Sequence, residues 1–384
     1  MKRRIWLLSA LLLALSMVSV PVQGQRKGNP TKSKHYKMSH QARLKEAVAE
    51  TPPVLQASLA EAFGDLYVYY DGRVCQVHTL AIDLIRTVYG ADSYKGLSPE
   101  QFLSGYVFFY DQWSGEPVVL LEGRSTQVLM DARSNWVSLP DFYDKGEYRL
   151  ERLLASGSKD AAKVDARVRM LEEVSRGELL RIWPPVGAET EWCSAAEEPD
   201  SAVLDAEALL FRSSVLDSIR GQLREGRNVR AHNMLNDIQL YQQSCCESGE
   251  LPSESRCDVE RWLLMKDYVL PFWVSLLALG VLFGVPFGKQ YRKNRRIVPW
   301  AVYVMEASML IEWLSLSGII GLIMYAYGRV PMGSFHEVLL CLAWVVLAAG
   351  IVYVPLHRRK NIRGIGGAIA LAAAGVLTLL AWMV

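Results

Sequence analysis

The sequence predicts a mainly α-helical membrane protein, in which an exported, helix-rich α+β domain is followed by four transmembrane helices. Of 384 residues, 51% are hydrophobic and 21% are charged, which is too apolar for a purely soluble chain and too charged for a membrane bundle alone. Four long apolar runs near the C-terminus and the basic loops between them are the other two indications. We expect the exported domain at residues 51–265 and the membrane domain at residues 266–384.

The first 24 residues resemble a secretory signal. Lys2, Arg3 and Arg4 precede an apolar stretch from Ile5 to Val20, and small residues follow. An uncleaved N-terminal anchor is the alternative, and in both cases the next segment is exported. Residues 25–50 are basic and poor in apolar side chains, so they are predicted to be a disordered tether.

A β-hairpin is predicted near the start of the exported domain. Leu66–Tyr70 is rich in residues that favour strands, Asp71-Gly72 suits a two-residue turn, and Arg73–Val77 continues as the second strand. Further short strands are expected at residues 118–121 and 179–182.

Helices account for most of the rest of this domain. Ser98 followed by Pro99 and Glu100 is typical of a capped helix start. Apolar residues at helical spacing between residues 200 and 246 predict two amphipathic helices, paired antiparallel with a break near Gly226. The other predicted helices are Val54–Phe63, Thr79–Tyr89, Lys159–Arg176 and a short helix from Asp258.

Each apolar run is long enough to cross a bilayer, because roughly 20 helical residues span a hydrocarbon core of about 30 Å. The runs are Tyr268–Gly288, Val298–Tyr327, Glu337–Leu356 and Gly364–Val384. Basic residues fill the first and third loops between them. The first loop carries Lys289, Arg292, Lys293, Arg295 and Arg296, and the third carries His357, Arg358, Arg359, Lys360 and Arg363.

Short loops rich in Lys and Arg stay on the cytoplasmic side. The second loop, Gly328–His336, has Arg329 as its single full charge and is therefore expected on the outer face, together with the large domain. This topology predicts a multi-pass protein of the bacterial inner membrane with its large domain in the periplasm.

Ionisable residues within or beside the apolar runs are candidates for function. Glu306 and Glu312 lie inside the second run, where a carboxylate should face protein or water. They are either functional acids or protonated acids that bond a neighbouring helix. His336 stands at the outer mouth of the third run, either as a cofactor ligand or as a solvated interfacial histidine.

Five of the six cysteines fall in the exported part: Cys75, Cys193, Cys245, Cys246 and Cys257. An odd number leaves at least one thiol unpaired within the chain. One interpretation is a disulfide from Cys245 or Cys246 to Cys257, and the other is a thiol-exchange site, against which the absence of Cys-x-x-Cys argues. The Cys and His spacing matches no zinc or iron–sulfur pattern, so no metal site is predicted.

The sequence contains no Ser-His-Asp signature, P-loop, Gly-x-Gly-x-x-Gly turn or His-Glu-x-x-His. No catalytic residue is therefore predicted. A formal net charge of +2 and basic loops explained by topology give no indication of a nucleic-acid partner. Because Cys-x-x-Cys-His is also absent, the chain is not itself a c-type cytochrome.

The segment Gly328–Trp344 resembles the CcsA/ResC family of cytochrome c biogenesis proteins. A Gly-x-x-Pro turn, a small polar pair, a Tyr-Glu and a downstream Ala-Trp occur in this order in the family, and His336 here takes the place of the usual Tyr. The candidates for a haem site or an assembly interface that follow from this resemblance are Arg329, Pro331, His336, Glu337 and Trp344.

The exported domain looks similar to the same family. Residues 71–81 resemble the Gly-Arg-x-x-Pro-x-x-Thr-x-Ala segment of fused ResB/CcsA-type (system II) proteins, with Gly72, Arg73 and Thr79 at motif positions and Gln76 in place of Pro. Residues 180–184, 238–242 and 251–253 recur there in similar order.

The resemblance implies a component of c-type cytochrome maturation. Such proteins bring haem to the outer membrane face and join it to the thiols of apocytochrome c. The family's tryptophan-rich haem-binding segment and its multi-helix ResB part are not found in this sequence, so the chain is expected to be one subunit of a split synthetase and not to be catalytic alone. The expected cofactor is haem, held with a partner chain.

The partners implied by the resemblance are a CcsA-like chain that carries the tryptophan-rich segment, a ResB-like protein and apocytochrome c, within a lipid bilayer. Two alternatives remain. One is a non-catalytic, membrane-anchored binding or scaffold protein for cytochrome assembly, and the other is a small transporter subunit that uses Glu306 and Glu312.

Overall fold

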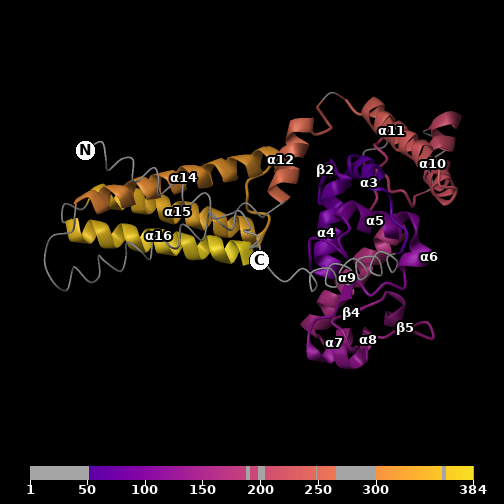
Figure 1. Ribbon diagram of the computed structural model, residues 1–384, viewed down its shortest axis with the longest axis horizontal. Helices are drawn as coiled ribbons and strands as arrows, with labels where there is room; N and C mark the ends of the chain where they lie inside the picture. The colour runs from indigo at the N-terminus through magenta and orange to yellow at the C-terminus, as the bar shows by residue number, and fades with distance from the viewer. Residues whose placement is uncertain are drawn as a thin grey trace, which may run out of the picture. The chain divides into compact units, whose positions relative to one another are not determined.

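The structure, a computed structural model, describes residues 52–186, 191–197, 204–247, 249–264, 299–356 and 360–383 and is mostly helical (Figure 1). The predicted signal, the tether, the run Tyr268–Gly288 and the first basic loop lie outside these residues. The described residues fall into two compact units, one ending at Cys257 and the other beginning at Asp258. We call them the globular unit and the helical unit.

The globular unit opens with helices around a hairpin. Its first elements are α3 (Ala57–Gly64), β1 (Tyr67–Tyr70), β2 (Arg73–Gln76), α4 (Val77–Tyr89), α5 (Pro99–Phe108) and α6 (Tyr110–Trp113). Tyr70 pairs with Arg73, and both turn residues have positive φ, 50° at Asp71 and 75° at Gly72, as a type I′ turn requires. The predicted hairpin is confirmed.

Helix α5 begins where the sequence places it. The Ser98 hydroxyl accepts a hydrogen bond from the Gln101 N–H, and the Gln101 side chain accepts one from the Ser98 N–H, which completes a capping box. The helix packs on a buried aromatic cluster in which the Trp113 ring lies 5.7 Å from Phe102 and 5.5 Å from Tyr106. A Cβ at Gly105 would lie 2.3 Å from the Trp113 ring, so only glycine allows this approach.

Short strands and helices follow. They are β3 (Val119–Leu120), α7 (Arg124–Leu129), β4 (Trp136–Val137), η2 (Pro140–Phe142), β5 (Tyr143–Asp144), β6 (Glu147–Tyr148), α8 (Glu151–Ala155) and α9 (Lys159–Ser175). β3 pairs with β4, and β5 with β6, both antiparallel. The strand expected at residues 118–121 is therefore present as β3.

The strand predicted at residues 179–182 is wrong. This segment is irregular, and its backbone carbonyls are bonded one by one: Arg181 O accepts from the Tyr69 N–H at 3.0 Å, and Ile182 O accepts from Gln242 Nε2 at 2.7 Å. Contacts from distant parts of the chain thus replace the strand pairing that the β-favouring residues suggest.

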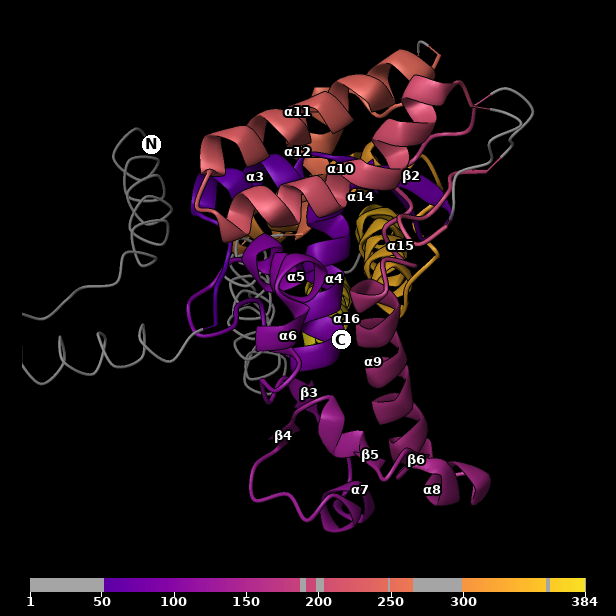
Figure 2. The same ribbon diagram turned by 90° about the vertical axis from the view of Figure 1, so that its right-hand side faces the viewer.

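Helices α10 (Ala206–Arg224) and α11 (Asn228–Cys245) form the expected antiparallel pair, side by side in Figure 2. The buried Gln242 amide holds α11 in place, because it accepts from the Tyr67 N–H at 3.0 Å and donates to Tyr67 O and Ile182 O, each at 2.7 Å. Helix α12 (Glu254–Leu264) contains the boundary between the two units. Cys245 and Cys246 are unbridged thiols, so the structure does not contain the expected disulfide to Cys257.

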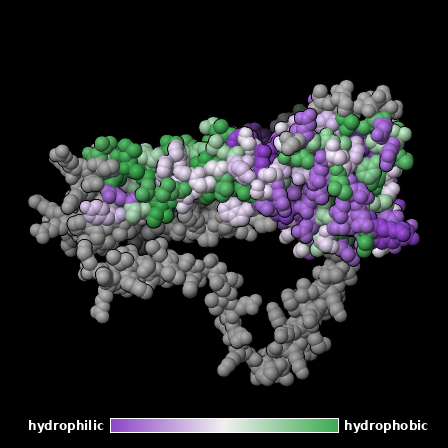
Figure 3. All heavy atoms as spheres, turned by 90° about the horizontal axis from the view of Figure 1, so that it is seen from above, coloured by the Kyte–Doolittle hydropathy of each residue, from purple (hydrophilic) through white to green (hydrophobic). Residues whose placement is uncertain are grey.

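The helical unit consists of α14 (Pro299–Tyr327), α15 (Phe335–Leu356) and α16 (Lys360–Met383), which pack along one another (Figure 1). Met305–Tyr327 and Phe335–Val354 are long and apolar enough to cross a membrane, and α16 contributes a shorter apolar stretch, Gly366–Ala381. Only 22% and 39% of the two spans are buried, unlike the core helix of a soluble protein. Figure 3 shows the exposed apolar residues of this unit, which are compatible with a membrane protein.

Candidate functional site

The loop between α14 and α15, together with the first turn of α15, brings two of the candidate residues, Arg329 and Glu337, into contact. The Glu337 carboxylate is 4% exposed and receives both Arg329 Nη1 at 3.0 Å and Nη2 at 3.3 Å. This bidentate, charge-assisted hydrogen bond fixes the orientation of both side chains. The Gly333 N–H also donates to Glu337 at 2.8 Å, so the carboxylate organises the whole loop.

The local sequence explains this loop. Ser334 caps α15 by accepting from the Glu337 N–H at 3.2 Å. A Cβ at Gly333 would lie 1.9 Å from Arg329 Nη1, so any larger residue here would have to displace the guanidinium. The guanidinium also lies 5.5 Å from the Tyr327 ring centroid. Pro331 is buried, and its carbonyl accepts from Cys341 Sγ at 3.4 Å.

His336 connects this loop to the end of α16. Its Nδ1 lies 2.7 Å from the Ala381 carbonyl oxygen. A carbonyl can only accept a hydrogen bond, so Nδ1 carries the proton and the lone pair of the neutral ring is on Nε2. Three apolar residues near His336 in the sequence, Val330, Met332 and Phe335, are each more than half exposed.

Trp344 does not join this loop. It lies in the middle of α15, where its ring stacks on Trp313 of α14 with centroids 5.4 Å apart and its Nε1 donates to Ser317 at 2.8 Å. Its role in the structure is to join α14 and α15.

The two acids predicted within the membrane have different surroundings. Glu312 is 4% exposed, and its Oε2 has no hydrogen-bond partner among the residues that the structure describes. Glu306 is partly exposed and has an interaction partner. The two are six positions apart, which places them on different faces of α14.

The motif of the globular unit has a structural role at two positions. Gly72 provides a positive φ in the hairpin turn, and Arg73 starts β2. Thr79 lies in the first turn of α4. Sequence reasoning missed its neighbour His78, whose Nδ1 bonds the Glu100 carboxylate; both residues are 8% exposed. Their separation of 22 positions gives no sequence signal, and Glu100 was expected only as a first-turn acid.

The electrostatics of this buried pair are clear in direction. Burial alone would raise the pKa of Glu100, but the hydrogen bond and the charge of His78 outweigh it and hold that pKa below its usual value. His78 Nε2 is buried and has no hydrogen-bond partner in the described part of the chain.

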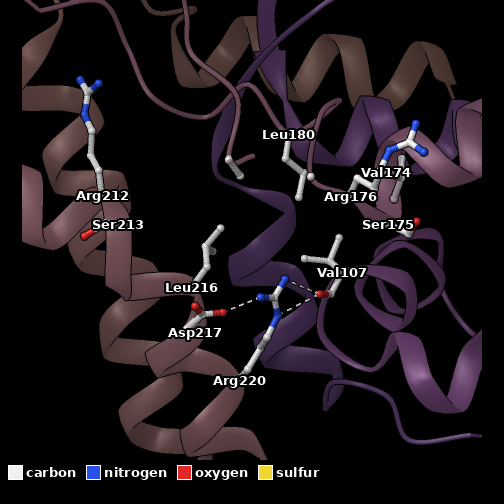
Figure 4. Close-up of a pocket in the computed structure, with 12 residues that line it drawn as sticks. Val107, Val174, Ser175, Arg176, Leu180, Arg212, Ser213, Leu216, Asp217 and Arg220 are labelled. Atoms are coloured by element: carbon white, nitrogen blue, oxygen red, sulfur yellow. Dashed lines mark hydrogen bonds and ion pairs between the residues drawn. The ribbon is translucent and has the colours of Figure 1, made fainter. Parts of the chain in front are cut away.

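The sequence also gave no indication of a pocket of about 150 Å³ between α5, α9 and α10 (Figure 4). Arg220 crosses it and bonds the Val107 carbonyl at 3.0 and 3.2 Å and Asp217 at 2.6 Å. The nearby Arg176 bonds Glu178. Arg212, which also lines the pocket, bonds the Tyr241 hydroxyl at 2.8 Å and the Pro184 carbonyl at 2.7 Å. Because all three arginines are already bonded to protein groups, the pocket does not present a strong anion site.

Comparison with known proteins shows a similarity to one curated protein, NrfI. No family model matches the chain. It is 24% identical over 349 residues to protein NrfI of Wolinella succinogenes, a match that covers 82% of this chain and 36% of NrfI. The chain thus spans little more than a third of the length of that relative.

Proposed function

We propose that this chain takes part in c-type cytochrome maturation at the outer face of a bacterial inner membrane, as one subunit of a split haem-attachment system. The similarity to NrfI along most of the chain supports a role in cytochrome c maturation. The resemblance of residues 328–344 to the CcsA/ResC family supports the finer assignment. The observation that supports this assignment is the geometry of the loop. Hydrogen bonds fix the orientation of the Arg329, His336 and Glu337 side chains of that motif.

The loop residues fit a haem group. A histidine that donates Nδ1–H to a backbone carbonyl presents Nε2 as an iron ligand, and the carbonyl fixes the ring and increases its basicity. His336 has this arrangement with Ala381. Arg329, which is 40% exposed at its side chain, could reach a propionate while Glu337 holds it, and exposed Met332 and Phe335 could cover porphyrin surface.

In this function haem supplies the iron and the vinyl groups that react with cysteine thiols. This chain's residues hold and orient the group: Glu337 keeps the Arg329 guanidinium directed, and the Ala381 carbonyl keeps the His336 ring in one tautomer. The basic loops predicted on the cytoplasmic side support a position of this loop on the outer face. We expect a partner chain with a tryptophan-rich segment to complete the site.

The test is purification of the tagged chain from detergent-solubilised membranes, with an absorption spectrum and identification of co-purifying proteins. We expect haem bands together with a tryptophan-rich CcsA-like chain. His336→Gln is the matched variant, because its amide can still donate to Ala381 but cannot ligate iron; it should keep the partner and lose haem. A haem-free eluate with the partner would favour a scaffold, and an eluate with neither would overturn the proposal.

A further inference from the structure

Glu312 lies near the middle of α14 (Pro299–Tyr327), within the candidate span Met305–Tyr327 and on the face that packs inside the helical unit. One turn before it, Met309 fills the space beside Gly350 of α15, which in turn faces Ala370 of α16. Just over one turn after it, Ser317 bonds Trp344. Glu312 therefore sits between two close helix contacts, away from both ends of α14.

The interior at this level is apolar. The buried residues of α15 and α16 between these contacts are Ala343, Leu347, Leu371 and Ala374, each fully inaccessible to solvent. An ionised carboxylate in such surroundings costs many kcal/mol unless it is paired, so the group takes up a proton instead.

The charged and titratable groups on the helices packed around Glu312 bond other groups or lie at other levels of the helical unit. On α15, Glu337 bonds Arg329, His336 bonds Ala381, and Cys341 bonds Pro331, all at the loop end. Tyr353 lies beside Gly366, beyond the Gly350 contact. The basic residues of α16 are in its first turn, and Glu306 is on another face of α14. Within the described residues, no cation is placed to pair with Glu312.

We propose that Glu312 is a proton-binding site at the middle of the membrane-spanning bundle, a carboxylic acid that carries its proton at neutral pH and exchanges it with water. This site is separate from the haem-handling loop and does not depend on that function. The next turn of α14 lies beyond this apolar level and carries Ser317, which accepts a hydrogen bond from Trp344. The Nε1 of Trp313 has no hydrogen-bond partner among the residues that the structure describes.

Such an acid is a modification site for dicyclohexylcarbodiimide. The carboxylic O–H adds across one C=N bond, its oxygen bonding to carbon and its proton to nitrogen, and acyl migration to nitrogen gives a stable N-acylurea without a leaving group. An ionised, paired carboxylate lacks the proton that this addition needs. Glu337, held by Arg329 and Gly333, is therefore an internal control on the neighbouring helix.

The experiment treats membranes containing the full chain with the carbodiimide over a series of pH values and maps the adduct by peptide mass spectrometry. We expect the adduct on Glu312 at neutral pH, less of it as the pH rises, and none on Glu337. Mapping the wild-type chain needs no variant, and Glu312→Gln should abolish the adduct. Protection by sodium chloride at constant pH would overturn the proposal in favour of a metal-cation site.

Infrared spectroscopy of the purified chain gives the second measurement. A carboxylic C=O band at neutral pH that shifts in D2O and is missing in Glu312→Gln is the expected result. Absence of this band in the wild-type chain at neutral pH would overturn the proposal, because it would show that Glu312 is ionised.

Discussion

The two units of the molecule differ in how they accommodate buried acidic groups. In the globular unit, Glu100 is bonded to His78, and Asp165 accepts from Tyr148 and Arg169, each at 2.8 Å. In the helical unit, Glu337 follows the same rule through Arg329, whereas Glu312 does not. A buried charge destabilises the fold unless it is paired. Glu312 has no hydrogen-bond partner among the described residues, so fold stability does not explain why an acid is at this position.

The units also differ in what holds their elements together. The globular unit uses long polar side chains that reach distant backbone groups. Arg167, for example, bonds Thr87 O at 3.0 Å and Leu120 O at 2.8 Å. The helical unit relies on close approach at small residues, such as Gly350 against Ala370. This is the packing expected where water is not available to drive helices together. The packing of the helical unit is therefore compatible with a membrane environment.

Removing Arg329 should have the largest effect, because it leaves Glu337 buried with only one donor from the loop backbone. We expect Arg329→Ala to lower the free energy of unfolding by about 2–4 kcal/mol, measured by thermal or urea unfolding of the detergent-solubilised chain. Arg329→Lys, which keeps the charge but not the two-pronged geometry, should lose less.

The double variant Arg329→Ala/Glu337→Gln tests the cause of this loss. It removes the uncompensated charge, so it should be more stable than Arg329→Ala alone. If the two variants are equally stable, Arg329 does not compensate the buried charge of Glu337. Glu337 and Glu312 would then not differ in whether a partner stabilises their charge.

Local signals in the sequence were sufficient for most elements of this fold. The turn at Asp71-Gly72 and the cap at Ser98 depend on adjacent residues, and the α10–α11 pair depends on helical periodicity. The segment 179–182 was mistaken because Gln242, some 60 positions away, satisfies its backbone. Propensity contains no information about such contacts.

The candidate site was predictable in its members but not in its geometry. Arg329 and Glu337 were both identified from the motif, and their separation by one short loop made contact possible. The bond from His336 to Ala381 joins residues 45 positions apart, and no sequence spacing indicates it. The position of Glu312 inside an apolar run predicted that it faces protein or water. Its lack of a hydrogen-bond partner among the described residues could be seen only once the three helices were placed.

Glu100→Gln should have an intermediate effect that depends on pH. The folded-state pKa of Glu100 is lowered, so its pair with His78 stabilises the fold fully above the unfolded pKa of about 4.3 and loses that contribution as the pH falls through the lower folded value. At pH 6 we expect the variant to be about 1–3 kcal/mol less stable than the wild type. The difference should shrink below about pH 4.5.

Urea unfolding followed by circular dichroism at several pH values measures this difference. Glu122→Gln is the matched control, since the pKa of Glu122 is also lowered, by hydrogen bonds from Lys163 and Arg167, but at a solvated surface. Its effect should be smaller at every pH. A difference between wild type and Glu100→Gln that stays constant down to pH 3 would show that the charge of Glu100 is not what His78 stabilises.

Glu312→Gln should have the smallest effect and gives the most direct contrast with Glu337. If Glu312 is a neutral acid without a partner, an amide of the same shape replaces one neutral polar group by another, and the unfolding free energy should change by less than about 0.5 kcal/mol. Glu312→Leu should be neutral or stabilising, because it removes a buried polar group that bonds nothing in the described structure. Thermal unfolding in detergent, with Glu337→Gln measured beside them, compares the two acids under one condition. If Glu312→Gln lost as much stability as Glu337→Gln, Glu312 would have to be ionised and paired, and the difference between the two acids would disappear.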